Sequence, residues 1–241
     1  MSLTLAWMEW RRFMRTPLAW IALALTLALL SWSFLGALES FNKLPAASRR
    51  LGLTHHLGLQ LYGLASVLML IITPILTLRA FSDPLRNGSY ALFSSAPLNN
   101  AQILIGKFLG ILLYQLLLVL LPLGLSLSLW SGTPIDPGLL LSATLGLLLL
   151  SAGFSAIGLG FSALSDHPGV AAAGSYGVLL LLSLLDQHTE RGSFLHWLAW
   201  PSHYLDLQMG LVRLHDLVYF LTLILFFLAF AWQRLERRLQ G

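Results

Sequence analysis

Long hydrophobic runs alternate with short polar segments along almost the whole chain. Six of these runs contain no Asp, Glu, Lys or Arg: Leu18–Leu38, Leu57–Leu78, Phe108–Ile135, Pro137–Ser165, Pro168–Leu185 and Leu217–Gln233. A membrane-spanning helix needs about 20 apolar residues, because it rises about 1.5 Å per residue through about 30 Å of hydrocarbon. Lipid offers no partners to backbone N–H and C=O groups, so each run must form a helix. The pattern therefore predicts six membrane-spanning helices.

Residues 1–17, before the first run, have the pattern of an amphipathic helix. One helical face carries Leu3, Trp7, Trp10 and Met14. The charged residues lie largely elsewhere around the helix and are Glu9, Arg11, Arg12 and Arg15. Tryptophan beside basic residues is typical of helices that lie at the membrane surface. We expect an interfacial helix that either anchors the chain or docks an intracellular partner.

The segment 186–216, before the last run, is long and mixed in polarity. Its core, Phe194–Leu214, is amphipathic and rich in tryptophan, yet it carries His196, His203, Asp206 and Arg213. Such a segment favours short interfacial or re-entrant helices on the outer side over a seventh crossing.

Composition supports the membrane class. Hydrophobic residues make up 57% of the 241 residues and charged residues only 10%, whereas globular chains carry about 25% charged residues. The runs leave no room for a separate soluble domain, and the alternating pattern of barrel strands is absent. We therefore expect an all-α, polytopic membrane protein with one transmembrane domain over residues 1–241. The first run has 21 residues, too long for a signal peptide, so we expect an uncleaved first span.

The net charge of +4 is compatible with binding to nucleic acid, but basic residues also gather on the cytoplasmic side of membrane proteins. With both termini inside, the inner segments would carry nine basic residues: Arg11, Arg12, Arg15, Arg79, Arg86, Lys107, Arg234, Arg237 and Arg238. The outer segments would carry five: Lys43, Arg49, Arg50, Arg191 and Arg213. We therefore expect cytoplasmic termini, membrane lipids as surroundings and no nucleic-acid partner.

Small residues recur four apart in two of the predicted spans. The first row is Ala152, Ala156 and Gly160, and the second is Gly169, Ala173 and Gly177. Such rows let helix backbones approach closely. We expect them to pack within the subunit, with a subunit interface as the alternative.

Several kinds of chemistry lack their usual residues. The chain has no cysteine, and the six runs hold no carboxylate or lysine of the kind that marks proton or sodium pathways. The stretch "AQILIGKF", Ala101–Phe108, lacks the first glycine and the final hydroxyl of a phosphate-binding loop. No carboxylate or cysteine stands at ligand spacing from the histidines, and no nucleophile elbow is present. We therefore expect no catalytic residue, no metal site and no cofactor bound by this chain.

Three stretches carry a family resemblance: "EWRRFMRTPLAW" (residues 9–20), "RAFSDPLRNGSYALFSSAP" (79–97) and "HYLDLQMGLVRLHDLVYF" (203–220). The first resembles the charged amphipathic entry and Thr/Ser-Pro of ABC-2 type transporter permeases, closest to the gliding-motility-type branch. The second is similar to that family's R-x-x-x-E-E-R-x-x-G-T segment, and Gly106–Lys107 matches the Gly-Lys that follows. The third matches its H…G…D…YF signature with His203, Gly210, Asp216, Tyr219 and Phe220.

The second stretch departs from the family pattern. Asp83, Pro84 and Leu85 stand where the family often has Glu-Glu-Arg, and Ser89 replaces the usual threonine. Proline suits the first turn of a helix, where its missing N–H costs nothing. We therefore expect Asp83 to be the N-cap of a short helix that begins at about Pro84.

The resemblance implies a non-catalytic permease subunit driven by a separate ABC ATPase, which binds ATP and Mg. Residues 79–104 would form the cytoplasmic coupling segment, with Arg79, Asp83, Arg86, Gly88 and Ser89 at the ATPase. The turn "SDHP" would make a second contact through Asp166 and His167. The outer segment 186–216, with His203, Gly210, Asp216 and Tyr219, would shape the exit side.

The resemblance also implies the setting. A multi-pass protein of the bacterial inner membrane would pair with a second permease copy, identical or paralogous, and with an auxiliary protein that bears an extracytoplasmic domain. Its role would be export of hydrophobic, amphipathic or lipid-linked cargo. The alternatives are a non-transporting scaffold that docks a cytoplasmic partner, a lipid-modifying enzyme that uses His203 and Asp216, and a gradient-driven transporter.

Overall fold

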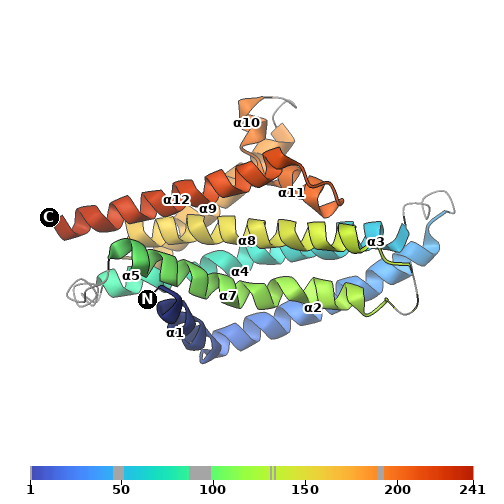
Figure 1. Ribbon diagram of the computed structural model, residues 1–241, viewed down its shortest axis with the longest axis horizontal. Coiled ribbons are helices and arrows are strands. Elements are labelled where there is room, and N and C mark those ends of the chain that lie inside the picture. Colours follow the sequence, from blue (N-terminus) through green and yellow to red (C-terminus); the bar gives the residue numbers. More distant parts are fainter. Residues whose placement is uncertain are drawn as a thin grey trace.

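The computed structural model describes residues 2–45, 52–86, 99–130, 132, 134–188 and 193–240. These residues form a helical bundle, and no strand occurs within them (Figure 1). In chain order the elements are α1 (Ser2–Met14), α2 (Pro17–Lys43), α3 (Gly52–Leu57), the π-helical turn η2 (Gly58–Tyr62), α4 (Gly63–Thr77), α5 (Arg79–Arg86), α7 (Asn100–Leu127), α8 (Pro137–Leu164), α9 (Pro168–His188), α10 (Phe194–Trp197), α11 (Trp200–Gln208) and α12 (Leu214–Gln240).

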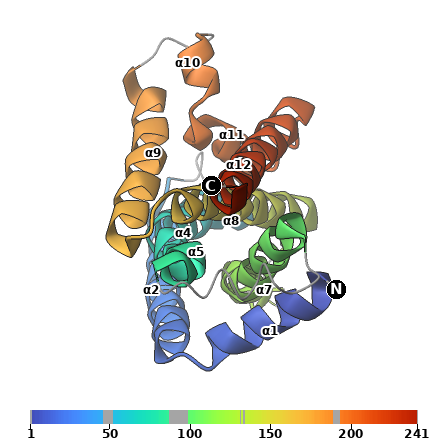
Figure 2. The ribbon, with the colours of Figure 1, turned by 90° about the vertical axis from the view of Figure 1, so that its left-hand side faces the viewer.

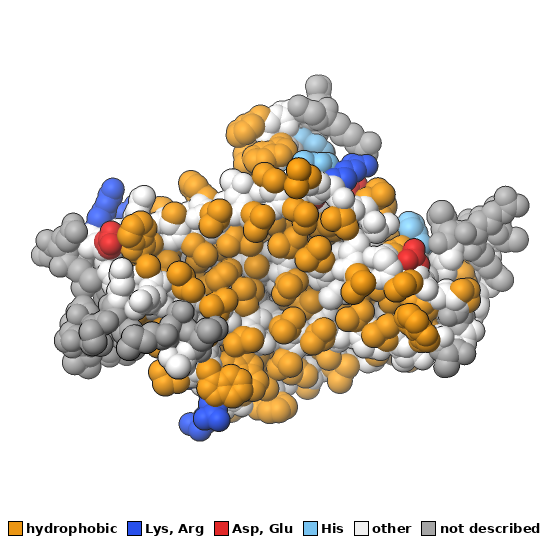
Figure 3. Space-filling view, in the orientation of Figure 1, with side chains coloured by type: hydrophobic (Ala, Val, Ile, Leu, Met, Phe, Trp, Pro, Cys, Tyr) orange, Lys and Arg blue, Asp and Glu red, His pale blue; other side chains and the backbone are white. Residues whose placement is uncertain are grey.

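Six helical segments in this part of the chain are long and apolar enough to cross a membrane. They are Pro17–Lys43, Gly52–Arg86, Asn100–Leu127, Pro137–Leu164, Pro168–Asp186 and Leu214–Arg237. The predicted all-α, six-span fold is thus confirmed. Figure 3 shows hydrophobic side chains over the middle of one face of the bundle, with the visible charged side chains toward its margins. Such a surface suits lipid, because exposed apolar patches of this extent are rare on monomeric soluble proteins.

The helices do not begin and end where hydrophobicity alone predicts. α2 continues to Lys43, five residues beyond the end of the hydrophobic run Leu18–Leu38, and Lys43 Nζ pairs with Glu39 Oε1 at 2.6 Å. α7 begins at Asn100, where the Asn99 side chain accepts a hydrogen bond from the Ala101 N–H, and it ends at Leu127. Caps and ion pairs of this kind extend or stop a helix without changing its mean polarity.

The helix α8 lies at the centre of the bundle and contacts α4, α7, α9, α11 and α12 (Figure 2). Gly146, Gly153 and Gly160, spaced seven residues apart on α8, let α11 and α12 approach closely. A Cβ at Gly146 would lie 2.8 Å from Leu207 Cβ, and one at Gly153 would lie 2.8 Å from Leu223 Cδ2. The row Ala152, Ala156 and Gly160 belongs to this packing, because both alanines are buried and Gly160 faces Phe227. This first small-residue row therefore packs within the subunit, as expected.

The second small-residue row has a different setting. Gly169 and Gly177 on α9 have no atom within 4 Å of where a Cβ would stand, and Ala173 between them is exposed. The row therefore lies on the outside of this subunit.

Both termini lie toward the end of the bundle that carries α5, and α3 lies at the opposite end (Figure 1). We call these the α5 end and the α3 end. Residue Lys107 near the start of α7, and Arg234 and Arg237 near the end of α12, belong to the α5 end together with Arg79 and Arg86. The basic residues expected on one side of the membrane thus come from elements that meet at one end.

Between α9 and α12 the chain folds into α10 and α11, which project from and pack on the side of the bundle (Figure 1). Both are too short to span a membrane, so the described part of the segment 186–216 forms short helices rather than a seventh crossing.

Candidate functional site

One face of α5 is exposed at the α5 end of the bundle. Arg79, Asp83 and Arg86 follow one another at helical spacing on that face, and the two arginines are exposed. Phe81 and Ser82, on the opposite face, are fully buried. Arg79, Asp83 and Arg86, which are predicted coupling residues, therefore share the outward face of one short helix.

The inward face of α5 is fastened to α8 by Ser162. Ser162 Oγ accepts hydrogen bonds from the backbone N–H groups of Phe81 at 2.9 Å and Ser82 at 3.2 Å, and it donates to the Leu78 carbonyl at 3.0 Å. Ser82 Oγ in turn donates to the Ser162 carbonyl at 3.2 Å. A single serine thus satisfies backbone groups where α4 passes into α5, and it ties this junction to the central helix.

The expectation that Asp83 caps a new helix at Pro84 is wrong. α5 begins at Arg79, directly after α4, and both Asp83 and Pro84 lie inside it. Asp-Pro is a typical helix start, but here the second span reaches these residues already helical, and the proline falls in the last turn before Arg86. Gly88 and Ser89 lie outside the described residues, as does the middle of the predicted coupling segment 79–104, residues 87–98.

The helix α1 lies against α7 at two glycines. A Cβ at Gly106 would come within 2.5 Å of Leu5 Cδ2, and one at Gly110 would lie 2.7 Å from Glu9 Cβ and 3.0 Å from the Ala6 carbonyl oxygen. Small residues four apart allow such close helix contact. The predicted interfacial helix is therefore docked on the third span, while its arginines Arg11, Arg12 and Arg15 are exposed.

A buried ion pair joins α1 to α7. Lys107 Nζ lies 2.7 Å from Glu9 Oε1, and the two side chains are 5% and 15% exposed. The same ammonium lies 5.4 Å from the centre of the Phe81 ring, so it also contacts α5. The sequence pattern placed Glu9 on the charged side of the interfacial helix and Lys107 among the inner basic residues, and it did not predict that the two residues pair. One feature of the sequence could have drawn attention to Glu9: it is the only acidic residue among the first 38.

A cavity of about 360 Å³ opens among α1, the start of α2, α4, α5 and α7. Its charged lining residues are Glu9, Arg12, Arg79, Asp83 and Lys107, and its apolar walls include Leu18, Ile75 and Leu76. The structure thus brings the predicted coupling residues Arg79 and Asp83 together with the predicted interfacial helix around one amphipathic pocket.

The turn between α8 and α9 holds the second predicted contact. Asp166 and His167 are exposed there, and α5 contacts both α8 and α9. The two surfaces that the sequence assigned to one partner are therefore neighbours at the α5 end.

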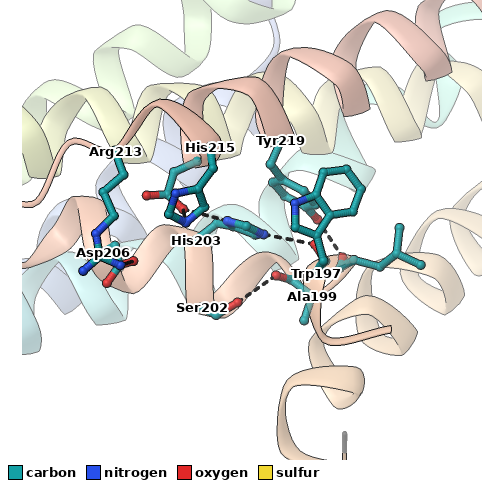
Figure 4. Close-up of polar contacts among 10 residues, drawn as sticks. Trp197, Ala199, Ser202, His203, Asp206, Arg213, His215 and Tyr219 are labelled. Carbon is teal, nitrogen blue, oxygen red and sulfur yellow. Dashed lines mark hydrogen bonds and ion pairs between the residues drawn. The ribbon is translucent and has the colours of Figure 1, made fainter. Parts of the chain in front are cut away.

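A second cluster connects α11 to the first turns of α12 (Figure 4). His203 Nδ1 lies 2.7 Å from Asp216 Oδ1, and the His203 ring stacks on Tyr219 with centroids 4.2 Å apart. The Tyr219 hydroxyl donates to the Leu198 carbonyl at 2.8 Å. His215, which sequence reasoning left unassigned, places its Nε2 3.0 Å from the same Asp216 oxygen.

Gly210 makes the turn that brings these helices together. Its φ of 87° lies in the left-handed region that favours glycine. The Leu211 N–H donates to the Asp206 carbonyl at 2.9 Å, and the Gly210 N–H donates to the Leu207 carbonyl at 3.2 Å. This pair of bonds is a Schellman motif, which ends α11 and turns the chain toward α12. Gly210 and three other predicted outer residues, His203, Asp216 and Tyr219, therefore form one structural unit.

The same helix α11 is fastened to the second span at its π-helical turn. Gln208 Nε2 donates to the carbonyls of Gly58 at 2.6 Å and Leu59 at 2.9 Å, and the Tyr204 hydroxyl donates to the Tyr62 carbonyl at 2.9 Å. A π-helical turn breaks the regular hydrogen-bond ladder, so its carbonyls need other partners inside a membrane. Sequence reasoning missed this contact, because nothing in the hydrophobic pattern marks a π-helical turn.

Comparison with known families agrees with this picture of a membrane bundle. A family model described as "ABC-2 family transporter protein" matches residues 3–238, which is nearly the whole chain. No curated protein matches the chain.

Proposed function

The chain belongs to the ABC-2 family of transporter proteins, and from this premise we propose that α5 is where a separate ABC ATPase engages it. The chain is the membrane-spanning permease component of an ABC transporter, and the family implies an ABC ATPase as its partner. We further propose that ATP and Mg bind to that partner, and that this chain holds no catalytic residue. The narrower assignment to the gliding-motility-type branch stays a prediction.

The observation that carries the proposal is the two-sided character of α5. Its outward face offers Arg79, Asp83 and Arg86, while its inward face is fixed to Ser162 of the central helix. A force applied to the exposed face would therefore reach the second and fourth spans together. Asp166 and His167 lie in the neighbouring turn and would widen the same contact.

The charge distribution supports an orientation. Arg79, Arg86, Arg234 and Arg237 belong to the α5 end, and basic residues gather on the cytoplasmic side of membrane proteins. We therefore place the α5 end and both termini in the cytoplasm of a bacterium, with the chain in its inner membrane. α1 would then lie at the inner membrane surface with Arg11, Arg12 and Arg15 toward lipid headgroups.

The lining of the pocket at this end supports a proposal for the cargo. The cavity beside α5 combines charged side chains with an apolar wall, which suits an amphipathic molecule better than a small ion. We propose export of hydrophobic, amphipathic or lipid-linked cargo, and the outer segment 186–216 would shape its exit. An auxiliary protein with an extracytoplasmic domain would act on that side.

The coupling proposal is tested by charge reversal on α5. The full-length chain is purified together with each ABC ATPase encoded beside its gene, and ATP hydrolysis is measured with and without the permease. We propose that Arg79 and Arg86 face acidic groups of the ATPase, so glutamates at these positions would repel it. The double variant Arg79→Glu, Arg86→Glu is therefore expected to weaken co-purification and stimulated hydrolysis at least about tenfold, which is about 1.4 kcal/mol.

The matched control for this test is Arg234→Glu, Arg237→Glu, which makes the same charge change at the same end on α12. It should leave both measurements near the wild-type values. If the α5 variant behaves like this control, the ATPase does not engage α5.

The second permease copy is proposed to pack on the small-residue row of α9, which lies outside the subunit. The chain has no native cysteine, so Ala173→Cys introduces a single thiol on that row. Since a disulfide requires Cα atoms within about 7 Å, oxidation should give a covalent dimer on a denaturing gel. Ile21→Cys, on the exposed face of α2, is the control. Equal cross-linking of the two variants would refute a homodimer across α9.

A further inference from the structure

We propose that His203, His215 and Asp216 form a binding site for a divalent transition metal ion, with Zn²⁺ as the best-suited ion. One ligand atom from each residue lies within 4.8 Å of the others. His203 comes from α11, and the other two come from the start of α12, so the ion would join two elements (Figure 4). Imidazole nitrogens and a carboxylate oxygen are ligands that zinc prefers, and two histidines with one carboxylate are a known zinc set.

Two contacts fix the orientation of the His203 ring. Its Nε2 lies 3.0 Å from the Trp197 carbonyl oxygen, which can only accept, so Nε2 carries a hydrogen. The other ring nitrogen, Nδ1, lies 2.7 Å from Asp216 Oδ1, which is a hydrogen-bond distance. Both atoms are also metal ligands, and an ion bound by both would replace this hydrogen bond.

Two further observations favour a metal ion over a proton. His215 Nε2 converges on the same Asp216 oxygen at 3.0 Å, although a single proton between His203 and Asp216 needs no second imidazole. Asp216 is fully buried, and its other oxygen, Oδ2, has no hydrogen-bond partner among the described residues. Leaving a buried carboxylate oxygen unpaired is costly, and a metal ion bound by both oxygens of Asp216 would satisfy it.

The surroundings match those of a ligand histidine. Metal-binding histidines usually donate their second ring N–H to a carbonyl or carboxylate, which fixes the tautomer, and Trp197 provides that carbonyl for His203. Arg213 lies in the same region, but its guanidinium is paired with Asp206 at 2.8 Å, so its charge is offset.

A cavity of about 340 Å³ adjoins the cluster and gives the ion a path from outside. Ser193, His196 and Ser202 contribute to its lining, together with the three proposed ligands. The cavity has room for a water molecule as a fourth ligand, as zinc sites with three protein ligands require. The side chain of His215 is 52% exposed, so it can swing onto an entering ion.

The test measures metal binding by the full-length chain in detergent and does not depend on transport. After treatment with a chelator, the protein is titrated with Zn²⁺ by calorimetry and with Co²⁺ by visible absorption, which reports imidazole and carboxylate coordination. We expect saturable binding of one ion per chain and a rise in Tm with zinc. His215→Ala should weaken affinity at least about tenfold, because even outer partners of ligands contribute 10–100-fold.

The control is His196→Ala, which changes a histidine of the same cavity outside the cluster and should leave the affinity unchanged. Because His215 is exposed, its loss leaves the fold intact, and gel filtration checks this. Asp216→Asn keeps the carboxylate's shape and should abolish the zinc-dependent rise in Tm. Absence of saturable binding at micromolar zinc, or equal affinity in wild type and His215→Ala, would overturn the proposal. The three residues would then only hold α11 and α12 together by hydrogen bonds.

Discussion

Replacing Lys107 with methionine is expected to destabilise the protein by about 3 kcal/mol, because the Glu9 carboxylate then stays largely buried without its partner. Breaking a buried ion pair from one side usually costs about 3–5 kcal/mol. The lower value applies here, since Arg12 stands 3.8 Å from Glu9 and keeps a weak exposed pair. The measurement is the free energy of unfolding in detergent, or the shift in Tm.

A double-mutant cycle separates the ion pair from packing. Glu9→Gln alone leaves the Lys107 ammonium buried among α1, α5 and α7, so it should also destabilise strongly. The combination of Glu9→Gln with Lys107→Met removes both charges and should cost clearly less than the sum of the single changes. Strict additivity would show that the two charges do not support each other.

Gly158→Ala is expected to be the second severe change. A Cβ at this position would overlap Thr77 Oγ1 and lie 2.7 Å from Thr77 Cβ, so α4 and α8 would have to separate. Overpacking of this kind costs about 1–3 kcal/mol, and sometimes more, because close-packed helices yield little. Thr77 directly precedes the junction of α4 and α5, so the strain would also reach the proposed coupling helix.

The matched control is Gly36→Ala on α2, where a Cβ would meet no atom within 4 Å. This change should stabilise by about 0.5–1 kcal/mol, because alanine favours the helix interior over glycine. Adding Thr77→Ala to Gly158→Ala removes the overlapping hydroxyl but leaves the Cβ contact, so it should restore only part of the lost stability. A Gly158→Ala protein with wild-type Tm would contradict the close contact between α4 and α8.

Sequence reasoning succeeded where one helical segment determines the answer. The six spans are an example, because each hydrophobic run is by itself long enough to cross a membrane. It failed at Asp83–Pro84, where a local signal for a helix start was overridden by a helix arriving from the second span. Capping preferences are worth about 1 kcal/mol, which is too little to break a helix that packing already holds.

The number of spans, the helical class and the presence of short helices before the last span were predicted from the chain alone. Each depends on the cost of transferring one segment into lipid, and that cost is set by the segment's own composition. The contacts between Glu9 and Lys107, between Ser162 and α5, and among His203, His215 and Asp216 required the tertiary structure. Residues far apart in the chain meet there because glycines let particular helix faces pack closely. Buried polar groups on those faces are stabilised only when they bond across the contact.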